Sequence, residues 1–356
     1  MERKIGLDLL RASAIILVVL GHSSVLLNGT FLEGFPYGKP IDGVDLFFVL
    51  SGFLIGSILL KDFNQDATKS TLFHFWKRRW FRTLPLYFLF LVLNFVFIEM
   101  NWIAGDTKQA TWHFLAFLQN FSKPFYDFYW ESWSLSVEEW FYLLFPLIFL
   151  YYLNIFNKKT AFLLGTISMI LLTLSYRNIS KTDQIDSFIY DVSFRKVVLI
   201  RLDSIAFGLL ISWLHFYYEE KLFKLRWILL IFSTIFLIYH RTIELNVTSS
   251  FAQLVYLSIS PIALCLSIPF FNSLKIRKSW FTNSITFISK ISYSMYLINL
   301  AIVISPLVQN FQKVNGLIRY GIAWSLIILL SYLSYRFIEK PITKLRDKKI
   351  NLLLFK

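Results

Sequence analysis

The sequence is poor in charged residues. Only 16% of its 356 residues are Asp, Glu, Lys or Arg, against about 25% in soluble domains. Hydrophobic residues instead make up 56% of the chain, and aromatic residues make up 19%. So little charge beside so much apolar surface excludes an ordinary soluble protein with one or two cores. The composition predicts a protein that crosses a membrane several times.

Other chemical signatures are missing as well. Cys265 is the only cysteine, which excludes a disulfide within the chain. The histidines show no metal-ligand spacing, so we predict no metal site. The sequence contains no Walker loop, no dinucleotide fingerprint and no Gly-x-Ser-x-Gly elbow. Any chemistry must therefore come from polar residues placed within the apolar segments.

Ten apolar runs are close to the ~20 residues that span a bilayer. They cover about residues 6–27, 42–60, 83–100, 135–153, 161–176, 197–214, 227–239, 251–271, 285–306 and 318–338. Lys and Arg concentrate in the loops on the side of the N-terminus, so the positive-inside rule places both termini in the cytoplasm. We predict an all-α fold with ten transmembrane helices in a single domain over 1–341, and a short basic cytoplasmic tail over 342–356.

The chain carries a net charge of +14, a balance that nucleic-acid-binding proteins also show. Here, however, the basic residues lie at the ends of apolar runs. That placement indicates membrane orientation and contact with the lipid bilayer or an anionic ligand. We therefore predict no nucleic-acid partner.

The first apolar run contains two ionisable residues, Arg11 and His22. Such groups are costly in lipid, which makes them functional candidates. A helical rise of about 1.5 Å per residue separates them by roughly 16 Å, about half of the ~30 Å hydrocarbon core. The alternatives are an Arg11 that snorkels to the inner surface and an interfacial His22. We favour function, with a cation near the inner side and a base near the outer side.

Glu138 follows Trp133 and Ser134 near the start of the fourth run. Its carboxylate could hold the His22 imidazole in one tautomer. The structural alternative is a helix N-terminus, where a serine caps and the dipole favours acidic residues. The spacing by itself does not choose between the two. Aromatic residues crowd the preceding loop, 101–134, where we favour an interfacial belt or re-entrant segment over a sugar-stacking surface.

Further charges lie in or beside other runs. Arg79 and Arg82 share a helical face, and paired guanidinium groups suit a polyphosphate, although basic clusters are common at inner helix ends. Asp45 lies in the outer part of the second run. Arg201 and Asp203 are predicted to neutralise each other as a structural pair.

Taken together, these segments resemble the membrane-bound acyltransferase family 3, the bacterial O-acyltransferases that modify cell-surface and exported sugars. The resemblance extends from end to end of the chain, and the motifs occur in family order. They are Leu7-Asp8 with Arg11-Ala12 and His22, the block 43–53, Arg79-x-x-Arg82, the stretch 133–138, Arg201-x-Asp203 with Gly208, the stretch 292–297, and residues 335–341. Each motif is weak by itself, but seven in order are specific.

This resemblance implies a multi-pass protein of the bacterial inner (cytoplasmic) membrane. It implies transfer of an acyl group, usually acetyl, from cytoplasmic acyl-CoA to a hydroxyl of a surface or exported polysaccharide or its lipid-linked precursor. His22 as general base, Glu138 and Arg11 are the catalytic candidates. Arg79 and Arg82, with Arg11, are the candidates for binding the acetyl-CoA phosphates. The acceptor-binding candidates are Trp133, Ser134, Asp45 and Asn299.

One departure from the family stands out. Asn299 occupies a position where the family often has His, and an amide cannot titrate. A second interpretation also stays open: ten spans with intramembrane charges would fit a non-catalytic carrier of a lipid-linked sugar or acyl group. The oligomeric state is not predicted by any feature of the sequence.

Overall fold

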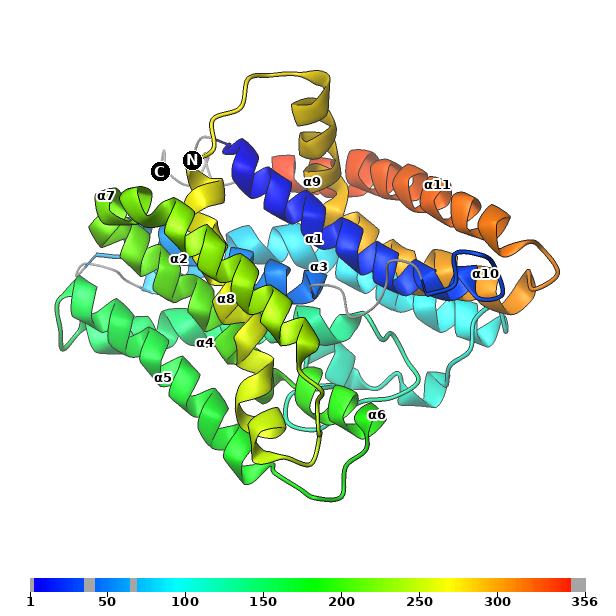
Figure 1. The fold of residues 1–356 in the computed structure, drawn as a ribbon, viewed down its shortest axis with the longest axis horizontal. Coiled ribbons are helices and arrows are strands. Elements are labelled where there is room, and N and C mark those ends of the chain that lie inside the picture. Colours follow the sequence, from blue (N-terminus) through cyan, green and yellow to red (C-terminus); the bar gives the residue numbers. More distant parts are fainter. Residues whose placement is uncertain (1–2, 35–41, 65–68, 347–356) are drawn as a thin grey trace.

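The computed structural model describes residues 3–34, 42–64 and 69–346, and all regular secondary structure in these residues is helical (Figure 1). Nine helices in the described residues are long and apolar enough to cross a membrane. They are Ile5–Leu27 (α1 and η1), Gly43–Asp62 (α2), Lys69–Glu99 (α3), Ser132–Leu153 (α4), Lys158–Ile179 (α5), Val198–Thr242 (α7), Ala252–Ser273 (η5 and α8), Trp280–Asn310 (α9, η6 and α10) and Gly316–Arg346 (α11 and η7). The chain is a multi-pass, all-α membrane protein.

The sixth of these helices, α7, explains why nine spans stand where ten were predicted. With 45 residues, α7 would be about 67 Å long if straight, more than twice the hydrocarbon core. Its helix is interrupted at Tyr218, where φ is −140° and ψ is 37°. The two arms, 198–217 and 219–242, contain the predicted runs 197–214 and 227–239. Counted as two spans, α7 restores the predicted number.

α3 begins earlier than the sequence predicted. The apolar pattern indicated a span from residue 83, but the helix starts at Lys69 and continues to Glu99. The additional turns carry the basic cluster that includes Arg79 and Arg82. Hydropathy marks only the part of a helix that contacts lipid, so it does not find polar turns that pack against protein. Both arginines are thereby fixed on a rigid element.

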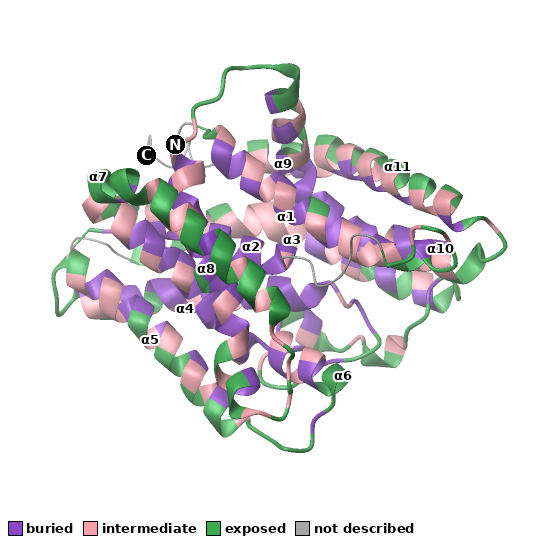
Figure 2. Ribbon diagram, in the orientation of Figure 1, coloured by how far each residue is buried: buried purple, intermediate pink, exposed green. Residues whose placement is uncertain are grey.

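Buried residues concentrate along α2, α4 and α8 in the middle of the bundle, whereas α5 and α11 expose much of their surface (Figure 2). Close packing of α2 on α7 depends on Gly52 and Gly208. A Cβ atom on Gly52 would overlap the carbonyl oxygen of Ile205, and one on Gly208 would overlap that of Val49. Small residues allow such backbone contact between membrane helices. Gly52 and Gly208 therefore allow α2 and α7 to meet backbone to backbone.

The aromatic outer loop is folded against the helices. Phe114, Phe128 and Tyr129 are buried, and the Tyr87 hydroxyl donates to the Phe114 carbonyl over 2.8 Å. Trp112 remains exposed, as a residue of an interfacial belt would be. Most of the loop therefore acts as a packed cover over the outer ends of α3 and α4.

The basic ends of the chain lie on one side of the bundle. Arg346 donates to the carbonyl of Arg78 over 3.2 Å, and Arg78 lies 3.9 Å from Asp62 at the end of α2. The tail predicted over 342–356 extends from here, and residues 347–356 lie outside the described residues. The end of the last span therefore lies beside the end of α2.

We expect Gly208→Val to lower the free energy of unfolding by about 1–3 kcal/mol, because the added methyl groups force α7 away from α2. Thermal unfolding of the detergent-solubilised protein, followed by tryptophan fluorescence, measures this change. Gly321→Val is the matched control, since a Cβ there meets nothing within 4 Å. Equal melting temperatures for the two variants would contradict the packing interpretation.

Candidate active site

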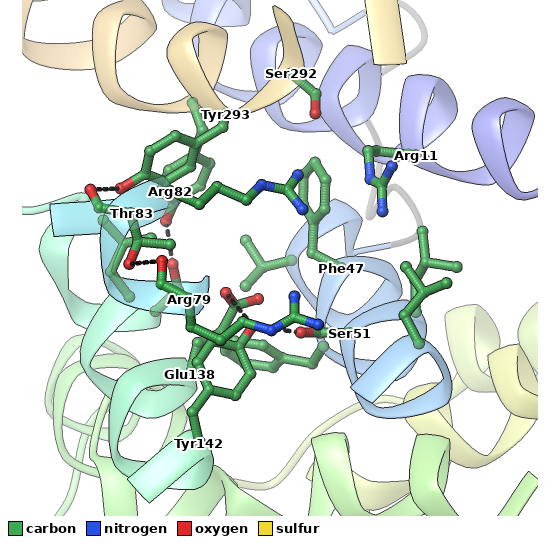
Figure 3. Close-up of a pocket in the computed structure, with 17 residues that line it drawn as sticks. Arg11, Phe47, Ser51, Arg79, Arg82, Thr83, Glu138, Tyr142, Ser292 and Tyr293 are labelled. Carbon is green, nitrogen blue, oxygen red and sulfur yellow. Dashed lines mark hydrogen bonds between the residues drawn. The ribbon is translucent and has the colours of Figure 1, made fainter. Parts of the chain in front are cut away.

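A cavity of about 110 Å³ lies among α1, α2, α3, α4 and α9. Figure 3 shows Arg11, Arg79, Arg82 and Glu138 around this space. Arg11 comes from α1, the other two arginines come from α3, and Glu138 comes from α4. Ser134 lines the same cavity. Five of the residues singled out from the sequence are thus brought together by the fold.

The three cavity arginines lack acidic partners. Within the described part of the chain, none of Arg11, Arg79 and Arg82 forms an ion pair or a side-chain hydrogen bond. The Arg79 guanidinium lies over the Tyr142 ring at 5.9 Å. Glu138 is the one carboxylate among the described lining residues, and it accepts from the Tyr142 hydroxyl over 2.9 Å. Because a guanidinium stays charged, the cavity carries a net positive charge suited to an anion.

Tyrosines that sequence reasoning did not select complete the walls. The Tyr293 hydroxyl donates to the Thr83 carbonyl over 2.8 Å, and Tyr296 and Ser134 share a hydrogen bond of 2.6 Å. Both tyrosines belong to the 292–297 motif, which served only as part of the resemblance. The sequence offered one signal for these residues: a tyrosine within an apolar helix needs a hydrogen-bond partner for its hydroxyl.

Two basic pockets adjoin the cavity. One, of about 570 Å³, shares Arg11 and is also lined by Arg3, Lys4 and Lys61. The other, of about 370 Å³, is lined by Arg79 and Arg82 together with Lys61. The cavity arginines therefore also face the side on which the basic loops lie. Among the described residues, no three His, Cys, Asp or Glu side chains group closely enough to hold a metal ion.

His22 does not line the cavity. Its Nδ1 atom lies 2.6 Å from Oδ1 of Asn299, and the predicted pairing with Glu138 does not form. α4 starts at residue 132, three residues before the predicted run, so Glu138 lies about 9 Å along that helix. Its carboxylate lines the cavity together with Arg11, whereas His22 does not.

Asp45 is also placed differently from the prediction. It forms a buried ion pair with Arg201, while Asp203 pairs with Arg177 over 2.8 Å. Residues two apart on a helix point about 200° apart, so Arg201 and Asp203 cannot neutralise each other as predicted. Arg177, which follows the predicted run 161–176, is fully buried within α5. Asp45 thus joins α2 to α7 and does not face the cavity.

Trp133 does not offer an open stacking face. Its ring meets Phe48 edge-on at 5.9 Å, and the Arg195 guanidinium covers it at 5.5 Å, so that only 5% of the residue is exposed. Arg195 in turn pairs with Asp42 at 2.7 Å and Asp191 at 2.9 Å. Although burial favours the neutral carboxyl, the charge of Arg195 lowers the pKa of Asp42. A charged cluster thus covers the outer end of α2.

The fold and the cavity define a multi-pass membrane protein with a cluster of three arginines around an internal cavity. Residues 4–336 match the family described as acyltransferase domain, so the chain belongs to that family. The resemblance inferred from the seven motifs is confirmed.

Curated relatives of the chain include two proteins named O-acetyltransferase OatA, from Staphylococcus aureus strains NCTC 8325 / PS 47 and MRSA252. Each is 29% identical over 384 aligned positions, which cover 95% of this chain and 57% of the relative. The chain therefore spans a little over half the length of these relatives. No solved structure matches the chain.

We expect Asp45→Leu to destabilise the protein by about 3–5 kcal/mol, because it leaves the buried Arg201 charge without a partner. The double variant Asp45→Leu/Arg201→Met removes both charges and should regain most of that loss. Thermal unfolding of the three proteins tests this. A double variant less stable than Asp45→Leu would show that the pair is not the source of the effect.

Proposed function

We propose that this protein is an O-acyltransferase of the bacterial inner membrane. It moves an acyl group, acetyl in the first instance, from cytoplasmic acyl-CoA to a hydroxyl of a surface or exported polysaccharide or its lipid-linked precursor. The name of the OatA relatives, O-acetyltransferase, supports the acetyl group and the hydroxyl acceptor. Membership of the acyltransferase family supports the reaction class.

The unpartnered arginines of the cavity are the observation that carries the proposal. Coenzyme A carries phosphate groups on its nucleotide end and a slender pantetheine arm that ends in the thioester. Arg79 and Arg82 line both the cavity and its basic side pocket, so they can hold phosphates that enter from the cytoplasm. Arg11 lines the cavity and the other pocket and extends this cationic path. The Glu138 carboxylate offsets part of the positive charge of the cavity arginines while no donor is bound.

His22 supplies the base. In our proposal, the imidazole takes the proton of the sugar hydroxyl while the hydroxyl oxygen attacks the thioester carbonyl carbon. The carbon–sulfur bond then breaks, and the proton passes from the imidazolium to the CoA sulfur. Tyr296 links the two regions, because it lines the cavity and its carbonyl accepts from Asn299, the partner of His22.

His22→Ala should fold normally and lose about 10²–10⁴-fold in acetylation rate, the usual contribution of a general base. The assay uses purified protein in liposomes, labelled acetyl-CoA and a polysaccharide acceptor, and records acceptor-dependent release of CoA. His240→Ala, at a histidine that lines none of the described pockets, is the control. Undiminished acetylation by His22→Ala would remove the base from the mechanism, and a carrier would show no CoA release at all.

The double variant Arg79→Gln/Arg82→Gln should raise the KM for acetyl-CoA at least about tenfold, because each lost charge-assisted hydrogen bond is worth about 1.5–3 kcal/mol. The kcat should change less than it does in His22→Ala. Lys77→Gln on the same helix removes a cation that does not line the cavity and serves as the control. If the KM is unchanged, the arginines do not bind the donor.

A further inference from the structure

The hydrogen bond between the side chains of His22 and Asn299 is short and lies inside the protein. Asn299 is fully buried, and its Oδ1 atom lies 2.6 Å from Nδ1 of the half-buried imidazole. A neutral imidazole carries its proton on either ring nitrogen, and the hydrogen bond at one nitrogen decides which. The orientation of the Asn299 amide therefore sets the state of the histidine.

The amide of Asn299 can point in only one direction. Its Nδ2 group donates to the carbonyl oxygens of Met295, over 3.0 Å, and Tyr296, over 2.7 Å. Carbonyl oxygens only accept, so a flipped amide would place Oδ1 against two acceptors and lose both hydrogen bonds. The oxygen must therefore face His22. An amide oxygen only accepts hydrogen bonds, so Nδ1 has to be the donor.

We infer that Asn299 is a positioning residue that holds His22 as the Nδ1–H tautomer and leaves the lone pair of Nε2 as the base. The inference deepens the proposed function and rests on it for its catalytic meaning. It replaces two predictions made from the sequence, in which Glu138 orients His22 and Asn299 contacts the acceptor. The amide needs no charge for this task, because its oxygen accepts from Nδ1–H both in the neutral ring and in the imidazolium.

The local backbone explains how Asn299 reaches its place. It begins the π-helical segment η6, Asn299–Ile304, at the end of α9. In an unbroken α-helix the Ala301 N–H would bond to the Leu297 carbonyl. Here it donates to Glu131 Oε1 over 2.7 Å. π-Helical turns of this kind re-aim side chains at functional sites.

Glu131 belongs to the cover formed by the outer loop and adds a second constraint. Its backbone carbonyl accepts from the Tyr296 hydroxyl over 3.1 Å. Burial raises the pKa of the Glu131 carboxyl to about 7, because the low-dielectric surroundings disfavour its charge. The cover, the π-helical turn and the amide thus form one connected support for the imidazole.

The direct test is nitrogen-15 NMR of the full-length protein with labelled histidine in nanodiscs at alkaline pH, where signals of protonated and unprotonated ring nitrogens are distinct. The His22 signals are assigned by their loss in His22→Ala. We expect a protonated Nδ1 and an unprotonated Nε2 in the wild type. Asn299→Ala should give a mixture of tautomers, and Asn299→Asp, which keeps an acceptor oxygen, should keep the wild-type pattern.

Acetylation rates give the second measurement. We expect a loss of about tenfold or more for Asn299→Ala, as for removal of one hydrogen bond to a charged group. Asn299→Asp should lose less, because it keeps the acceptor toward Nδ1 although it loses the two hydrogen bonds to the Met295 and Tyr296 carbonyls. An unchanged tautomer in Asn299→Ala overturns the inference, whatever the rate. The NMR result needs no turnover, so it stands even if His22→Ala retains activity and the proposed base is wrong.

Discussion

An arginine within a membrane keeps its charge, and the structure is organised around where each guanidinium finds compensation. Arg177 and Arg201 are fully buried and are matched by Asp203 and Asp45 on neighbouring helices. These pairs join α5, α2 and α7 into a rigid scaffold, since removal of one partner would leave a buried charge. The arginines of the cavity are the exception, because they line open space and lack acidic partners among the described residues. The contrast separates arginines that support the fold from those available to a ligand.

The scaffold makes the unpaired charges possible. Backbone contact at Gly52 and Gly208 fixes α2 on α7, and α2 forms one wall of the cavity through residues such as Phe47 and Ser51. The opposite wall comes from α3, whose basic turns continue the helix beyond its apolar part. Rigid walls hold like charges near one another at a cost that an anionic ligand would offset. Packing and binding are therefore linked through the same helices.

The polar side chains at the outer end of the bundle differ from the cavity arginines, because they have partners. There the side chains are satisfied mutually: Arg195 binds Asp42, and Asn299 binds His22. Backbone departures from the α-helix accompany this region, at η6 and in the π-helical segment Asp191–Arg195. Such departures free backbone groups for tertiary hydrogen bonds, as the Ala301 N–H shows with Glu131. The arginines that line the cavity form no ion pair, whereas the polar side chains at the outer end are paired with one another.

The sequence by itself determined the membrane class, the approximate number of spans and the candidate arginines, because hydropathy and the scarcity of charge act residue by residue along a helix. It could not decide which charges meet, since partners such as Asp45 and Arg201 are more than a hundred residues apart. Nor could it bring Glu138 into the cavity with Arg11 or give His22 to Asn299. Those pairings depend on helix start points, tilts and one π-helical turn, which only the packed bundle fixes.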